Sequence, residues 1–252
     1  MISACGLKRL KNRQSGVGKN KLGRWAEMKT FSNVIEPETS SVKNVQHPLR
    51  GRWKSDYFGN EKPISLELGC GKGEYTLGLA KRYPARNFIG IDIKGARIWR
   101  GAKTAFENNV SNVLFLRTRI EFINSFFADN EVDEIWITFP DPFPKPKNEA
   151  RRLTSPPFLN SYRLFLKDKG FVHLKTDNHD LFIYTHELVK FNNLEIVSAT
   201  EDLYSGSYEN ETLTIRTHYE NIFLQENKKI NHLSFMLPKE KPIRYANQGK
   251  EL

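Results

Sequence analysis

Short apolar runs alternate with amphipathic stretches from residue 64 to residue 238. Apolar runs bounded by turn residues are typical of buried strands, and apolar positions three and four residues apart are typical of helices. We predict strands over 64–67, 88–93, 113–118, 134–140, 171–176, 195–200 and 232–238. We predict helices over 74–83, 94–109, 120–127, 156–166 and 178–191, and a further helix that opens at Thr217. This alternation predicts an α/β fold with a mainly parallel, seven-stranded sheet and helices on both faces.

The flanking segments lack this alternation. Residues 63–240 form the predicted α/β domain, and residues 31–62, which mix prolines and aromatics with polar residues, form an irregular cover over the sheet. Residues 1–30 form a basic arm, and residues 241–252 form a short tail. No apolar run is long enough to cross a bilayer, so no membrane partner is expected. The two cysteines, Cys5 and Cys70, are too few for a disulfide framework and indicate a reducing compartment, the cytoplasm.

Positive charge is concentrated at the amino terminus. The 252 residues have a formal net charge of +10 and a pI near 9.5. The arm holds eight basic residues, Lys21 and Arg24 among them, against one acid, Glu27. Such a balance predicts attraction to polyanions, nucleic acid first and acidic membrane second. We expect the arm to become ordered on RNA phosphates; a solvated tail is the alternative.

A glycine-rich turn follows the first predicted strand. Gly69, Gly71 and Gly73 let the backbone turn sharply and approach a ligand, and the next strand ends at Asp92, an acid that can accept both hydroxyls of a ribose. The third glycine stands two positions after the second, whereas in the dinucleotide-binding fingerprint it stands three positions after the second. Glu67, just before the turn, would repel a pyrophosphate and suit a cationic amine. A nicotinamide-dependent dehydrogenase and a turn without a ligand are the alternatives.

A proline-rich loop, residues 139–153, follows the 134–140 strand. Its four prolines predict an extended, rigid backbone that presents Asp141, then Lys145, Arg151 and Arg152. The carboxyl ends of the strands are where an open α/β sheet holds its ligands. A stiffened linker with solvated charges is the alternative interpretation.

Two further motifs follow. Asp177 ends another strand and is expected to face the same cleft as Asp92 and Asp141. Thr217 followed by Glu220 forms a predicted capping box. The six histidines have no spacing typical of a metal site, and we predict none.

Five motifs, in this order, resemble the bacterial tRNA (guanine-N7)-methyltransferases, which have a Rossmann-like fold. The motifs are Glu67 to Gly73 (ELGCGKG), Phe139 to Lys145 (FPDPFPK), Arg151 to Leu153 (RRL), Lys175 to Asp177 (KTD) and Thr217 to Glu220 (THYE). The resemblance runs from about residue 21 to about residue 237, nearly the whole chain.

The resemblance implies the cofactor S-adenosylmethionine and tRNA as partner, with methyl transfer to N7 of a guanine in the variable loop. It assigns Glu67 to the methionyl amine, Gly69 and Gly71 to the cofactor turn and Asp92 to the ribose. Thr118 stands where the family often has an Asp near the adenine. Asp141 matches the residue proposed as catalytic and also a cofactor contact. The matching substrate-binding positions are Lys145, Asp177, Thr217, His218, Tyr219 and Glu220.

We expect Arg151, Arg152, Lys21 and Arg24 to contact RNA phosphates more weakly. The oligomeric state is expected to be a monomer or a homodimer. Two alternatives to this function remain: a methyltransferase of this fold with another substrate, and a non-catalytic RNA-binding protein on the same fold. Both Glu67 and Asp141 are present, which favours the catalytic interpretation over the last of these.

Overall fold

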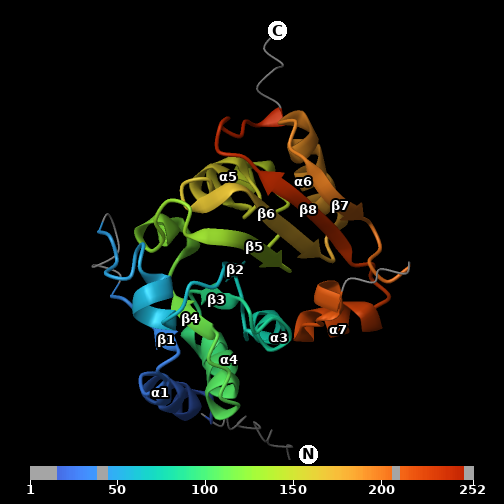
Figure 1. Cartoon of the computed structure of the whole chain (residues 1–252). Helices are drawn as coiled ribbons and strands as arrows, with labels where there is room; N and C mark the ends of the chain where they lie inside the picture. The colour runs from blue at the N-terminus through green and yellow to red at the C-terminus, as the bar shows by residue number, and fades with distance from the viewer. Residues whose placement is uncertain (1–15, 39–44, 206–210, 247–252) are drawn as a thin grey trace, which may run out of the picture.

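The computed structural model describes residues 16–38, 45–205 and 211–246 (Figure 1). The strands are β1 (Val34–Ile35), β2 (Ile64–Leu68), β3 (Asn87–Asp92), β4 (Val113–Arg117), β5 (Val132–Thr138), β6 (Leu166–Thr176), β7 (Ile196–Thr200) and β8 (Asn231–Leu237). The α-helices are α1 (Gly16–Met28), α3 (Glu74–Arg82), α4 (Gly95–Glu107), α5 (Pro156–Tyr162), α6 (His179–Phe191) and α7 (His218–Gln225). A π-helix, η1 (Trp53–Phe58), and three 3₁₀ helices, η2 (Ile120–Ser125), η3 (Pro146–Arg151) and η4 (Glu211–Thr214), complete the described elements.

The strands form one eight-stranded sheet in the order β1-β4-β3-β2-β5-β6-β8-β7. All pairs are parallel except those of β8, which runs antiparallel to both β6 and β7. The chain winds outward from β2 in one direction and then from β5 in the other, so the topological switch point lies between β2 and β5. A ligand site is expected outside the carboxyl ends of these two strands.

The predicted α/β class and the mainly parallel sheet are confirmed, but two details were wrong. The sheet has an eighth strand, β1, because two residues that pair with β4 are too few to produce a periodic pattern in the sequence. The last strand, β8, does not close the sheet; it lies between β6 and β7. Nearly all of β8 is buried, whereas β7 is half exposed and forms the edge.

Two apolar cores cover the two faces of the sheet. One contains residues of α5 and α6, and the other contains residues of α1, α3 and α4. Figure 1 shows α5 and α6 on one side of the strands and α1, α3, α4 and α7 on the other. Every residue of β2 and β3 is buried, as expected for central strands with both faces covered.

The segments before the α/β domain contain more structure than their composition indicates. Residues 16–28 of the basic arm form α1, and residues 1–15 lie outside the described part of the chain. The cover segment contributes β1 and the π-helix, which Trp53 anchors: its indole is fully buried and donates to the carbonyl of Phe126 at 2.7 Å. Among the helices that the structure describes, none has the length and apolar character to span a membrane.

Candidate active site

The glycine turn joins β2 to α3 at the switch point. Gly69, Gly71 and Gly73 have φ values of 76°, 56° and 70°, a left-handed conformation that side chains disfavour. A Cβ added to Gly73 would lie 2.3 Å from the ring of Phe115, so this glycine also permits close packing of the turn on β4. The amides of Gly69 and Cys70 donate to the carbonyl of Ile91 at 2.8 and 3.0 Å. The turn is therefore held against the end of β3.

Glu67 lies near the end of β2 beneath this turn and is 2% exposed. One carboxylate oxygen accepts from the amide of Thr76 at 2.8 Å and from its hydroxyl, and the other accepts from the hydroxyl of Thr138 at 2.6 Å. Burial raises the pKa of the Glu67 carboxyl to about 7, although the hydrogen bonds from Thr138 and Thr76 oppose the shift. The two threonines were missed in the sequence because only the assembled sheet brings them to the acid.

A cavity of about 450 Å³ opens beside the turn, within the range of roughly 300–1,000 Å³ typical of small-molecule sites. Gly69, Asp92, Thr118 and Asp141, which lie at or just beyond the ends of β2, β3, β4 and β5, line it together; their contacts with a cofactor stay predictions. Asp92 accepts from the amides of Gly71 at 3.0 Å and Lys94 at 2.7 Å, so its carboxylate is fixed in the cavity wall.

The proline loop is less extended than predicted. Phe139 and Phe143 have φ values of 48° and 43°, and residues 146–151 form the 3₁₀ helix η3. Positive φ at a bulky residue is strained and persists only where surrounding contacts enforce it. The amide of Phe139 donates to the carbonyl of Lys175 at 2.8 Å. Asp141, exposed between the two strained residues, is thus carried on a backbone held at a defined position.

Arg151 and Arg152, both predicted to contact RNA phosphates, have different surroundings in the structure. The guanidinium of Arg152 donates to the carbonyls of Pro142 and Phe143 at 3.2–3.3 Å and lies 4.2 Å from the ring centre of Tyr184. Arg152 therefore stabilises the conformation of the proline loop, a role that the sequence alone did not predict. Arg151 is exposed at the cavity, with its guanidinium 4.4 Å from the ring centre of Phe143.

The remaining predicted cations are Lys145, Lys21 and Arg24. Lys145 is exposed at the start of η3. Lys21 and Arg24 lie on α1, and the guanidinium of Arg24 stacks 4.6 Å from the ring centre of Trp99. RNA contacts of these side chains stay predictions.

A second, smaller hollow of about 60 Å³ adjoins the cavity and shares Gly69, Arg97 and Phe139 with it. Glu67, Gly71, Thr217 and Tyr219 line this hollow, so the glycine turn and the start of α7 both contribute to its wall. Three further side chains in the lining are charged: Lys72, Glu74 and Arg97.

The capping box at the start of α7 is confirmed. Thr217 accepts from the amide of Glu220 at 3.1 Å, and Glu220 accepts from the amide of Thr217 at 3.2 Å. His218 is exposed, and its amide donates to Glu74 at 2.7 Å. Glu220 is fully buried and forms an ion pair with Lys175 at 2.7 Å. Thr217 and Tyr219 thus lie at the site, whereas Glu220 points into the protein.

Asp177 does not share the cleft of Asp92 and Asp141, contrary to expectation. It lines a separate hollow of about 360 Å³ with His179, Lys228 and others, and Lys228 lies 3.5 Å from its carboxylate. The carboxyl end of β6 is two strands away from β2 in the sheet, which separates the two hollows. The role of Asp177 in substrate binding stays a prediction.

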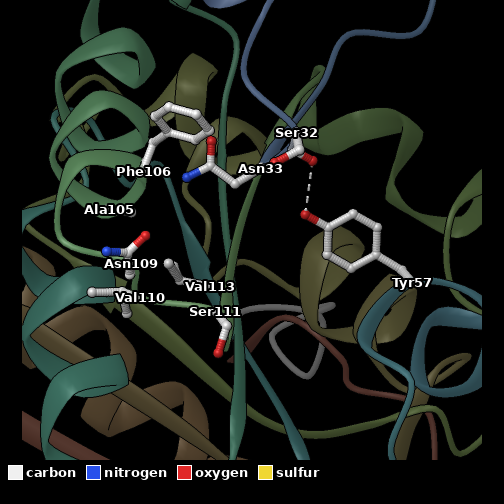
Figure 2. A pocket seen from close by; sticks show the side chains of 9 residues that line it. All are labelled: Ser32, Asn33, Tyr57, Ala105, Phe106, Asn109, Val110, Ser111 and Val113. Carbon is white, nitrogen blue, oxygen red and sulfur yellow. Dashed lines mark hydrogen bonds between the residues drawn. The ribbon is translucent and has the colours of Figure 1, made fainter.

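A further hollow of about 490 Å³ lies at the opposite end of β4, next to Val113 (Figure 2). It is larger than the cavity beside the glycine turn, but no charged side chain is among the described residues that line it. Two of its lining residues are joined by a hydrogen bond, in which the hydroxyl of Tyr57 donates to the carbonyl of Ser32 at 3.1 Å. The chemistry expected of a catalytic site is therefore at the carboxyl ends of the strands.

Known proteins are similar in sequence to this chain along most of its length. The model of a family described as "Putative methyltransferase" matches residues 61–233. A Bacteroides thetaiotaomicron protein named tRNA (guanine-N(7)-)-methyltransferase is 46% identical over 224 residues, which cover 89% of this chain and 88% of that protein. A Porphyromonas gingivalis protein of the same name is 51% identical over 213 residues, which cover 83% and 86%. The chain belongs to the tRNA (guanine-N(7)-)-methyltransferase family.

Solved structures support the fold assigned to this family member. The crystal structure of the 16S rRNA methyltransferase KamB aligns with a TM-score of 0.57 at 13% identity, covering 78% of this chain and 95% of that one. A structure titled an antibiotic-related methyltransferase aligns with a TM-score of 0.54 at 17% identity, covering 81% and 96%. At such identities the likeness concerns the fold alone, and it confirms the Rossmann-like methyltransferase architecture.

Proposed function

We propose that the protein transfers a methyl group from S-adenosylmethionine to N7 of a guanine in the variable loop of tRNA, in the cytoplasm. The observation that carries the proposal is the cavity at the switch point, where Asp92, Thr118 and Asp141 converge beside the glycine turn. Family membership and the names of the relatives support the choice of reaction and of RNA class.

The residues fit the proposed cofactor. Gly69 and Gly71 have no side chain to obstruct a close ligand, and the cavity is large enough for a nucleoside. When bound, S-adenosylmethionine supplies an electrophilic methyl group on a sulfonium centre. Glu67 would bind the amino group, because a buried carboxylate beneath a turn suits a cation. Asp92 would bind the ribose hydroxyls, and Thr118 would contact the adenine.

Guanine N7 carries an in-plane lone pair and no proton, so its methylation requires no general base. What the protein has to supply is alignment of the base and negative charge near a purine that becomes cationic. Asp141 meets both needs, because it is exposed at the cavity on a loop fixed by Arg152. Arg151, Lys145 and the basic arm would bind phosphates and contribute affinity without sequence choice.

Methyl transfer to tRNA from labelled S-adenosylmethionine tests the proposal. We expect product 7-methylguanine, detected by mass spectrometry of the digested RNA, and no transfer to a tRNA whose target guanine is replaced by 7-deazaguanine. Methylation of the deaza substrate would assign another acceptor atom. Cofactor binding without transfer to any tRNA would favour a different substrate, and RNA binding without cofactor binding would favour the non-catalytic alternative.

A further inference from the structure

Lys175 is the most completely enclosed cation near the site. Its side chain and that of Glu220 are both 0% exposed, and its ammonium is 2.7 Å from the Glu220 carboxylate. The same ammonium donates to the carbonyls of Leu213 at 2.9 Å and Ile215 at 3.1 Å. An ammonium has three N–H groups, and all three have acceptors. Burial lowers the pKa of Lys175, and the adjacent Glu220 carboxylate opposes this shift.

All three acceptors belong to one segment, residues 211–225, which comprises η4 and α7 and which we call the wall segment. It carries Thr217 and Tyr219 to the hollow beside Glu67. Lys175 is the last residue but one of β6, and its carbonyl accepts from the amide of Phe139 at the start of the proline loop. One residue therefore contacts two parts of the site, the proline loop through its backbone and the wall segment through its side chain.

Helix α3 holds the wall segment from the other direction. The hydroxyl of Tyr75 donates to the carbonyl of Thr212 at 3.0 Å, and Glu74 accepts from the amide of His218 at 2.7 Å. Gly78 permits the close approach, because a Cβ there would lie 2.6 Å from Cγ2 of Ile215. These contacts join backbone groups of the wall segment to side chains of α3, so its position depends on long-range anchors.

We propose that Lys175 is a positioning residue that holds the wall segment at the tRNA-binding side, and that Glu220 is its ion-pair partner in this anchor rather than a ligand of the substrate. The proposal rests on the proposed function. Its physical reason is that a buried, fully hydrogen-bonded pair fixes geometry strongly, since moving either charge away leaves the other desolvated. Thr217 and Tyr219 are then left to face the ligand.

The test combines hydrogen exchange with methyl-transfer kinetics. In Lys175→Met we expect amide protection of the wall segment to fall by about tenfold or more while that of β2 and β5 changes little. The KM for tRNA should rise about ten- to a hundredfold, the size of losing one charge-assisted hydrogen bond, with a smaller change in kcat. Lys167→Met is the matched control, because Lys167 is also on β6 and also ion-paired, to Asp133 at the far end of the strand.

Two further variants separate positioning from stability. Lys175→Met combined with Glu220→Gln removes both buried charges, so global stability should recover while wall protection and tRNA KM stay impaired. Gly78→Ala displaces Ile215 with the ion pair intact and should produce the same KM effect, smaller in size. Recovery of KM together with stability in the double variant would reduce the pair to a stabilising role and refute the proposal.

Glu220→Gln alone decides the second half of the proposal. We expect loss of wall protection to accompany a rise in the KM for tRNA; a raised KM with unchanged protection would make Glu220 a substrate ligand. Hydrogen exchange needs neither cofactor nor tRNA. It therefore tests the anchor even if the wild-type protein fails to methylate guanine N7, and that failure would refute the proposed function instead.

Discussion

The raised pKa of Glu67 predicts that cofactor affinity depends on pH. A carboxyl with a pKa of about 7 is charged in about nine-tenths of molecules at pH 8 and in about one-tenth at pH 6. If the charged form binds the protonated amino group of S-adenosylmethionine, whose own pKa is about 7.8, Kd should be about fourfold higher at pH 6 than at pH 8. Binding below pH 7 should also release a proton, which calorimetry in buffers of different ionisation enthalpy detects.

Glu67→Gln tests the origin of this dependence. The amide keeps the volume, can accept from Thr76 and can donate to Thr138, so the turn should fold as before. Loss of the charge should weaken cofactor binding by about ten- to a hundredfold and abolish the gain in affinity from pH 6 to pH 8. A Kd in the wild-type protein that is the same at pH 6 and 8 would refute the reasoning.

Other charged groups near Glu67 define the controls. Asp92 lies close enough to raise the Glu67 pKa further, and Lys72, Glu74 and Arg97 line the same hollow. Glu131→Gln provides the matched control, since Glu131 is also a buried carboxylate that accepts backbone amides, those of Gly51 and Ala128 among them, but lies outside the cavity. This variant should keep the wild-type Kd and its pH dependence.

The raised pKa of Glu67 also makes the stability of the folded protein depend on pH. Glu67 binds its proton more tightly in the folded protein than in the unfolded chain, where the ordinary value is 4.5. The free energy of unfolding of the cofactor-free protein should therefore fall as pH rises from 4.5 to about 7 because of this group. A bound cation offsets that cost, so the increase in Tm caused by S-adenosylmethionine should grow over the same range. An increase in Tm that shrinks with pH would contradict the assignment.

Three shorter predictions concern the loops. Asp141→Asn should lower the single-turnover methyl-transfer rate by about 10²–10³ with little change in tRNA affinity, whereas equal losses in both would assign it to binding alone. Arg152→Ala should lower the methyl-transfer rate by loosening the proline loop and leave the salt dependence of tRNA binding unchanged. Lys145→Ala should reduce the slope of log affinity against log salt concentration by about 0.7–0.9. A reduced slope in Arg152→Ala and an unchanged slope in Lys145→Ala would exchange the two roles. Gly73→Ala should destabilise the protein in urea more than Gly59→Ala, because both have positive φ but only the former meets a ring, and equal losses would show that the clash is relieved.

The sequence by itself determined the features that depend on neighbours along the chain. The apolar runs specified the α/β class, and the spacing of Gly69, Gly71 and Gly73 specified the turn, since left-handed φ at three nearby positions strongly favours residues without a Cβ. The capping box of Thr217 and Glu220 also formed as predicted, because its two hydrogen bonds close within four residues.

Only the tertiary structure decided which charges are available to a ligand. Arg151 and Arg152 are adjacent and chemically alike, yet one is exposed at the cavity and the other donates to carbonyls of the proline loop. Asp177 and Asp92 both lie at the carboxyl ends of strands, but the order of the strands puts them in different hollows.

The same applies to the buried charges. The pKa of Glu67 comes from burial, and the partner of Lys175 stands 45 positions along the chain at Glu220. A sequence shows that such a group carries a charge, but its solvation and its partner arise from packing between distant segments. The tertiary structure therefore decides whether each charge binds a ligand or holds the site together.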